Sequence, residues 1–245
     1  PPASVPRPVP AATPDLPSVI EAQAVSTTVA DSIAGLSDVV WNWSDIEDFT
    51  VKAVDQVLSS RNTPRDRVTP PSMTVAVPAI EAMRYSPLRE QIAALIATSM
   101  DASRALEVHP SFIEMLKQIT MDEVRILKAM PAHGLVLPMA HVNYIVGRNR
   151  VISGHRNVIP AALAQVCDAK RSLPYYIDNL IRMNAIETPQ NLFIDDDRRY
   201  RELLDQTFVS SFAAAATSDR KVEGEKTLVG LTNFGETFRR VCLSA

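Results

Sequence analysis

The feature that most constrains the fold of this chain is a repeated pairing of a helix-start signal with apolar residues spaced three and four apart. That spacing puts apolar side chains on one face of an α-helix, and the start signal satisfies the free backbone N–H groups that open it. The clearest signal is the pair Thr120 and Glu123, in which each side chain can bond the other residue's backbone N–H. Val124, Leu127 and Met130 follow at helical spacing. This part of the chain therefore predicts helices whose apolar faces pack together.

The same pairing recurs through most of the chain. Ser86 is predicted to cap a helix, because serine accepts a hydrogen bond from a free backbone N–H. The large apolar residues of that helix form one predicted stripe, made of Leu88, Ile92, Leu95, Ile96 and Met100. The predicted helical segments are 16–58 with a junction at 41–48, 75–83, 86–101, 110–119, 120–130, 157–170, 172–185, 195–217 and 232–241.

β-branched residues in partly alternating order first occur after residue 131. The segments 135–147 and 150–154 are predicted to form a hairpin or two short strands, and 227–231 one more short strand. The polar segment 218–226 before that last strand is predicted to be a turn.

The order of elements after residue 167 is similar to a winged helix, in which a recognition-type helix leads into a two-stranded wing. The predicted helix ends at Asn184 where such helices have glycine, and asparagine tolerates the left-handed backbone that this turn needs. Ile186 then begins an extended segment, and the residues 231–235 are similar to those after a second wing strand. An insertion at about 195–217 separates the two predicted wing strands.

These patterns predict a mainly α protein with an N-terminal helical bundle and a winged-helix-like α+β C-terminal part that carries a helical insertion in its wing. The predicted boundaries are 18–131 for the bundle and 132–245 for the winged-helix-like part. Residues 1–17 hold seven of the eighteen prolines and are predicted to be an extended arm or linker.

The composition excludes several classes of protein. A net charge of -3 gives no overall attraction to nucleic acid or to an anionic membrane. No stretch approaches the roughly 18 to 20 apolar residues of a membrane span, and no basic-then-apolar leader opens these residues. Cys167 and Cys242 lie far apart without metal-like spacing and are predicted to be buried free thiols, so we expect a cytoplasmic protein.

No motif for catalysis is present. The sequence lacks a nucleophile elbow, a phosphate loop, a zinc spacing and a dinucleotide-binding motif, so we expect no catalytic, cofactor or metal site. His109, before Pro110, is predicted to serve a helix start. The acids 195–197 precede arginines and are predicted to complement a helix dipole, although three adjacent acids also suit Mg²⁺.

Two basic segments are the candidate contact sites for a partner or for nucleic acid. The first has no acid among its cations and contributes Arg148, Arg150, His155 and Arg156. The second, around the predicted recognition helix, contributes Lys170, Arg171, Tyr175, Asn179 and Arg182. Residues 167–184 hold three cations and two acids, a net charge of +1, which is low for a phosphate-binding surface.

Four stretches in consistent order resemble the Abi-alpha family of bacterial abortive-infection proteins: 77–101, 108–130, 176–187 and 231–242. Among them "HPSF" at 109–112 follows a helix ending in "MD", and "LTNFG" at 231–235 lies near the C-terminus. The resemblance implies a mostly helical cytoplasmic protein that acts in antiviral defence, and it implies no catalytic residue.

We therefore expect a non-enzymatic component of abortive-infection defence that acts through contacts with a phage or host protein. The alternative is a winged-helix DNA-binding regulator, whose binding to duplex DNA weakens steeply with salt. A third hypothesis is a hydrolase or nuclease that uses His109 or the acids 195–197.

Overall fold

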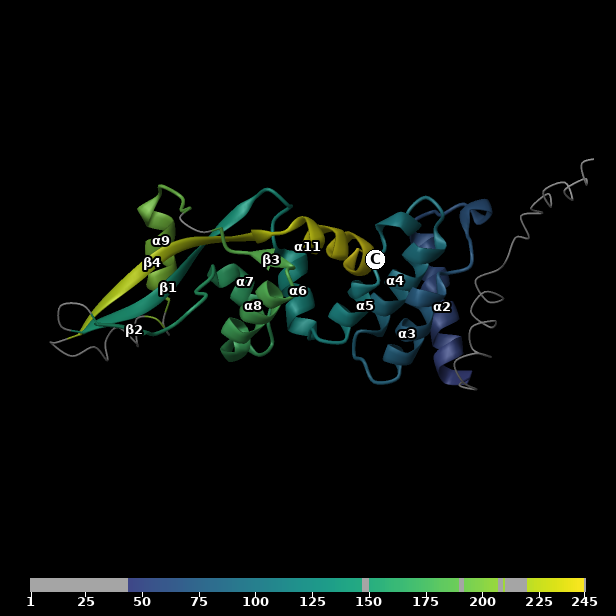
Figure 1. Cartoon of the computed structure of the whole chain (residues 1–245), viewed down its shortest axis with the longest axis horizontal. Helices are drawn as coiled ribbons and strands as arrows, with labels where there is room; N and C mark the ends of the chain where they lie inside the picture. The colour runs from purple at the N-terminus through teal and green to yellow at the C-terminus, as the bar shows by residue number, and fades with distance from the viewer. Residues whose placement is uncertain (1–43, 147–149, 190–191, 207–208, 210–219, 245) are drawn as a thin grey trace, which may run out of the picture.

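The computed structural model of the chain describes residues 44–146, 150–189, 192–206, 209 and 220–244. It is mainly helical with one small antiparallel sheet. Figure 1 shows a body of helices at one end of an elongated molecule and a long β-ribbon that extends away from it. The predicted arm 1–17 and the predicted helical segment up to residue 43 lie outside the described residues.

The helical body is built around α4. Its elements are α2 (Ser44–Ser60), the 3₁₀ turn η1 (Arg65–Arg67), α3 (Met73–Met83), α4 (Arg89–Met100), the 3₁₀ turn η2 (Ala105–Glu107), α5 (Ser111–Leu116) and α6 (Met121–Ala129). All five residues of the predicted apolar stripe are buried, and burial extends around the rest of α4, because every residue from Gln91 to Met100 is buried. Small residues such as Ala93 and Ala97 occupy the faces outside the stripe and let neighbouring helices approach from several sides.

The helix starts agree closely with the sequence. Both halves of the predicted box exist: Thr120 N donates to Glu123 Oε2 at 2.6 Å, and Glu123 N donates to Thr120 Oγ1 at 3.4 Å. His109 accepts a hydrogen bond from Ser111 N at the start of α5, 3.2 Å from its Nδ1. Ser86 differs, because its Oγ accepts from Leu88 N in the turn before α4 and the helix begins only at residue 89.

The sheet has the strand order β2-β1-β4-β3, and every neighbouring pair is antiparallel. Its strands are β1 (Val136–Val146), β2 (Arg150–Ser153), β3 (Ile186–Glu187) and β4 (Arg220–Leu231). The hairpin of β1 and β2 confirms its prediction. The predicted turn at 218–226 is wrong, since residues 220–226 belong to β4 and pair with β1 as far as Val146. β1 supplies the backbone partners, so β4 needs few apolar residues of its own there.

The short helices between β2 and β4 are α7 (Ala161–Gln165), the 3₁₀ turn η3 (Lys170–Ser172), α8 (Leu173–Arg182) and α9 (Asp197–Leu204). A helix running from 157 through Pro160 is not formed. Val158 instead pairs with Ala140 of β1, and α7 begins after the proline, which disfavours helix at the residue before it. Asn184 has φ 57°, which confirms the predicted left-handed turn between α8 and β3.

The C-terminal residues return to the helical body. α11 (Asn233–Phe238) starts at Thr232, whose Oγ1 accepts from Gly235 N at 2.9 Å, and it continues as the π-helix η4 (Arg239–Leu243). Thr98 Oγ1 of α4 donates to Val241 O of η4 at 3.1 Å. One apolar core includes residues from α2, α4, α6, α8 and η4. The division of the chain at residue 131 stays a prediction.

Candidate functional site

A cavity of about 610 Å³ lies beside the sheet, between the segment after β2, α7, the start of α8 and the end of α9. We name it the basic groove. Its cationic and imidazole side chains are His155, Arg156, Lys170 and Arg171. The other residues that line it are Asn157, Val158, Ala161, Ala164, Gln165, Leu173, Pro174, Asp205 and Gln206. Two basic segments that are separate in the sequence therefore meet at one concave surface.

The segment that carries His155 and Arg156 is held against β1. Val142 N donates to His155 O at 2.7 Å, and Ala140 and Val158 exchange two backbone hydrogen bonds at 2.9 and 3.0 Å. Between these contacts Asn157 is buried with φ 55°, and its Nδ2 donates to Asp178 Oδ1 of α8 at 2.6 Å. Because this segment has fixed partners on both sides, one wall of the groove is preformed.

The turn that carries Lys170 and Arg171 is held by a buried carboxylate at the start of α6. Asp122 Oδ1 accepts from Asp168 N, and Asp122 Oδ2 accepts from Ala169 N, both at 2.9 Å. Arg125 Nη1 adds contacts of 2.7 Å to Asp122 Oδ1 and 2.6 Å to Asp168 Oδ2. Burial favours the neutral acid, but these donors outweigh it and hold the pKa of Asp122 below its usual value.

The charge in the basic groove is positive and largely uncompensated. Arg156, Lys170 and Arg171 are exposed, and none of them takes part in an ion pair with another described residue. Asp205 is the carboxylate of the lining. Burial and then the charge of Arg156 hold the pKa of His141, whose Nδ1 accepts a hydrogen bond from Asn157 N, below its usual value. An anionic ligand would therefore find several cations without competing partners.

The floor of the groove is apolar. Val158 and Leu173 are buried there, Ala164 and Pro174 are half-buried, and the exposed Ala161 also lines the groove. Gln206 Nε2 donates to Ile159 O at 2.9 Å and fastens the residues after α9 to the groove wall. The floor suits apolar side chains of a ligand whose acidic groups lie at the rim.

The other predicted contact residues lie elsewhere. Arg148 is outside the described residues, and Arg150 begins β2 opposite Val146. Tyr175 is 73% exposed on α8 but does not line the groove. Asn179 Nδ2 donates to Glu123 Oε1 at 2.6 Å, and Arg182 Nη2 donates to Gln118 Oε1 at 2.9 Å. These last two side chains join α8 to the start of α6.

The sequence did not indicate the apolar floor or the contribution of α9. Val158 and Ala161 lie in the predicted helix 157–170, Leu173 lies in the predicted helix 172–185, and Asp205 lies in the insertion, for which no neighbour is predicted. The one local signal was Asn157, since asparagine adopts a left-handed backbone more readily than most residues.

The residues of the hydrolase hypothesis have structural partners. His109 is exposed, and its Nδ1 accepts from Ser111 N. Asp196 caps α9 by accepting from Arg198 N at 3.1 Å, and Asp197 pairs with Lys226 of β4. Within the described parts of the chain, no three His, Cys, Asp or Glu side chains are grouped so as to hold a metal ion.

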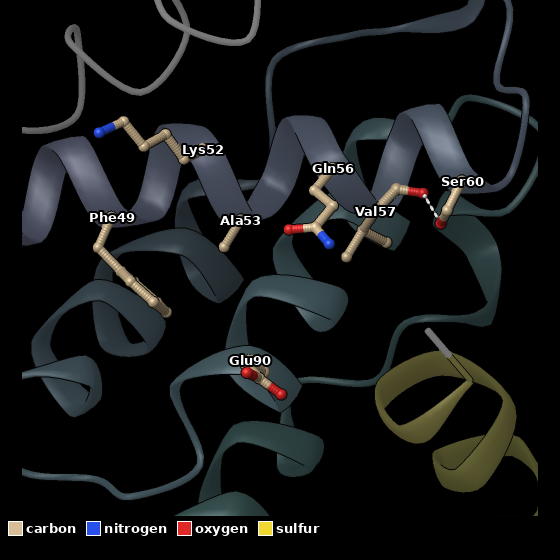
Figure 2. A pocket seen from close by; sticks show the side chains of 7 residues that line it. All are labelled: Phe49, Lys52, Ala53, Gln56, Val57, Ser60 and Glu90. Carbon is tan, nitrogen blue, oxygen red and sulfur yellow. Dashed lines mark hydrogen bonds between the residues drawn. The ribbon is translucent and has the colours of Figure 1, made fainter.

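A second, smaller cavity of about 310 Å³ lies along α2 in the helical body. Figure 2 shows Phe49, Ala53 and Val57 of α2 directed toward a space beneath the helix, with Glu90 of α4 on the other side. We name it the α2 groove.

Among the helices that the structure describes, none is both long and apolar enough to cross a membrane.

The family model described as "Abortive infection alpha" matches residues 44–242, which is most of the chain and includes every described element except the last residue of η4. The chain belongs to the Abortive infection alpha family. No curated protein and no solved structure matches it.

Both cavities lie inside the family match. The match includes the residues of the basic groove, from His155 to Gln206, and those of the α2 groove, from Phe49 to Glu90. It also spans the β-ribbon and the C-terminal return of α11 and η4 onto α4. The Abortive infection alpha match therefore covers the helical body and the basic groove together.

Proposed function

We propose that this member of the Abortive infection alpha family is a cytoplasmic, non-enzymatic component of bacterial antiviral defence that binds a phage or host protein in the basic groove. The observation that carries the proposal is the convergence of Arg156, Lys170 and Arg171, without ion pairs among the described residues, over an apolar floor. Such a surface fits a segment of a partner protein that combines acidic and apolar side chains.

The winged-helix-like arrangement is part of this proposal. α8 leads through Asn184 into β3, and β3 pairs with β4. In our proposal this unit serves protein contact. Asn179 and Arg182, the polar residues that a recognition helix would offer to bases, bond to Glu123 and Gln118 of the same chain. A concave site with an apolar floor also suits a peptide segment better than a duplex, whose phosphates favour wide basic surfaces.

The proposal is tested by phage challenge of cells that carry the double variant Lys170→Glu/Arg171→Glu. Reversing both charges repels an acidic partner, so we expect protection to fall roughly tenfold or more, and the partner to be lost from a pull-down made during infection. The matched control is Arg65→Glu/Arg67→Glu, which reverses two exposed arginines on η1, a 3₁₀ turn of the same length remote from the groove.

Three results would overturn the proposal. Full protection by a folded Lys170→Glu/Arg171→Glu variant would show that the groove is not used. Loss of protection in a folded His109→Ala or Asp196→Ala variant would favour the hydrolase hypothesis. Binding of the purified protein to duplex DNA at low salt would favour the DNA-binding alternative if the Lys170→Glu/Arg171→Glu variant abolished that binding.

A further inference from the structure

The side of β4 that faces away from β1 carries backbone groups that point out of the sheet. In β1, Ala140 and Val142 use both their N–H and their C=O groups to bond the chain after β2. Lys226 and Gly224 lie directly opposite these two residues, so their own N–H and C=O groups point away from β1. Val222 repeats this direction two residues earlier in β4.

These outward groups have no partner among the residues that the structure describes. β3 pairs only with the last two residues of β4, and no described residue bonds the outer N–H or C=O groups of Val222, Gly224 and Lys226. We name this stretch of β4 the β4 edge; it lies along the β-ribbon in Figure 1. An unpaired strand edge is a template for a further strand, and proteins bind extended segments in this way.

One face of the β4 edge is acidic. Glu223 and Glu225 are exposed, and their side chains share one face because alternate residues of a strand point the same way. Neither carboxylate takes part in an ion pair with a described residue. Lys226, on the other face, is already paired with Asp197 of α9. The edge therefore offers two uncompensated carboxylates beside its free backbone groups.

The other face of the β4 edge offers apolar contacts. Gly224 has no side chain, and Leu204 of α9 lies over it, 2.9 Å from the position that a Cβ would take. Glycine within a strand often marks a place where another backbone approaches closely. Phe193 is 57% exposed, and its ring centre lies 5.9 Å from Lys226 Nζ. An apolar side chain opposite Gly224 in an added strand would therefore lie beside Leu204.

A second copy of the chain is a poor partner for this edge. Two copies related by a two-fold axis would pair their β4 strands antiparallel. With Gly224 at the centre, Glu223 of one copy lies opposite Glu225 of the other, and with Glu225 at the centre this residue lies opposite its own counterpart. Like charges directly opposite each other destabilise a strand pair. The same charges favour a partner strand with cations at these positions.

We propose that the β4 edge binds an extended segment of a partner protein in which two Lys or Arg residues flank an apolar residue. The segment adds a strand to β4. Its backbone bonds the free groups of the edge, its two cations face Glu223 and Glu225, and its apolar side chain lies opposite Gly224. β1 separates this surface from the segment that forms one wall of the basic groove, so the proposal is independent of the function of that groove.

Amide exchange of the full chain, followed by NMR, tests this binding with a synthetic peptide as the probe. The peptide has blocked ends and the alternating sequence Lys-Val-Lys-Val-Lys. At saturating peptide we expect the amides of residues 222, 224 and 226 to exchange about tenfold or more slowly, because they become hydrogen-bonded in the added strand. A peptide of the same composition in the order Lys-Lys-Val-Val-Lys has no two lysines at alternate positions and should give much less protection.

Charge reversal supplies matched variants. Glu223→Lys/Glu225→Lys should weaken binding of the alternating peptide about tenfold or more, and should allow binding of Glu-Val-Glu-Val-Glu instead. Asp55→Lys/Asp66→Lys makes the same change in net charge at two exposed acids of the helical body and should leave both affinities unchanged. Exchange of the α4 amides reports whether each variant is folded.

Three results would overturn the proposal. In the first, the peptide binds or fails to bind without slowing exchange at residues 222, 224 and 226. In the second, the two double variants lose equal affinity, so that overall charge and not the β4 edge accounts for binding. In the third, these amides are protected without peptide and the protection rises with protein concentration, since a second copy would then supply the added strand.

Discussion

At the scale of single residues, Asp122 shows how a helix-start residue gains a second role from the fold. Asp122 lies in the predicted helix 120–130, and the structure places it in the first turn of α6. Its carboxylate also holds the backbone of Asp168 and Ala169, which carries the turn to Lys170 and Arg171. This second role was not predictable, because the accepting and donating groups are more than forty residues apart in the chain.

Asp122→Asn should lower the free energy of unfolding at pH 7 by about 2–3 kcal/mol, since the variant loses charge-assisted bonds and sets an amide N–H₂ against backbone donors. The folded pKa of Asp122 is lowered, so its stabilisation is present above the unfolded pKa of about 3.9 and is lost as the pH falls through the folded pKa. Urea unfolding at several pH values measures the free energy of unfolding of both proteins. The difference between wild type and Asp122→Asn should become smaller below about pH 4.

Glu114→Gln is the control for this experiment. Glu114 is 58% exposed and pairs with Lys117 on the surface, so its loss should change stability by less than about 1 kcal/mol at any of these pH values. If the difference in free energy of unfolding between wild type and Asp122→Asn stayed constant with pH, the charge of Asp122 would not be the source of its stabilisation.

At the scale of elements, the sequence predicted where most helices begin far better than which surfaces they cover. Starts such as Thr120 and Thr232 were predictable because the hydrogen bonds that define them lie within four residues. The length of β4 was not, since its polar half is ordered by pairing with β1 more than seventy residues earlier. The basic groove could not be predicted for the same reason. Its cations were recognisable in the sequence, but contacts between segments far apart in the chain bring them to one cavity.

The junction of β3 and α11 offers a test of packing between elements. A Cβ on Gly235 would lie 1.9 Å from Ala185 O, so Gly235→Ala forces two backbones apart. Alanine normally stabilises a helix relative to glycine by about 1 kcal/mol, but here we expect a loss of about 3 kcal/mol or more in urea unfolding.

Gly224→Ala provides the comparison on the β-ribbon. Its Cβ would meet Leu204 Cδ1 at 2.9 Å, and that atom is the movable end of a side chain. We expect a loss of about 1 kcal/mol at most. Equal losses in the two variants would mean that the contact of Gly235 with Ala185 does not limit the packing of α11.

At the scale of the whole molecule, the two ends of the described chain meet on α4. Arg61 Nη2 donates to Ser244 O at 2.7 Å, and Arg240 Nε contacts Glu107 Oε2 at 3.0 Å. Val241 and Cys242 are buried in the same core as α4, and burial raises the pKa of the Cys242 thiol well above its usual value. A thiol in this state is unreactive, so the C-terminal turn acts as core.

Because the C-terminal residues pack into the core of the helical body, we can test whether the chain divides into two independently folding parts at residue 131. A fragment of residues 1–131 would expose the surfaces of α4 and α6 that contact η4 and the ring of Phe112 that packs against Phe238. It would also leave Thr98 without its bond to Val241. We expect it to lack a cooperative urea transition by circular dichroism and to regain one on addition of residues 132–245. The full chain should unfold in one step. The opposite result would be that fragment 1–131 unfolds cooperatively alone and that the full chain shows the same transition as a separate step. That result would support two separate domains, because the helical body would then be stable without the residues of η4 in its core.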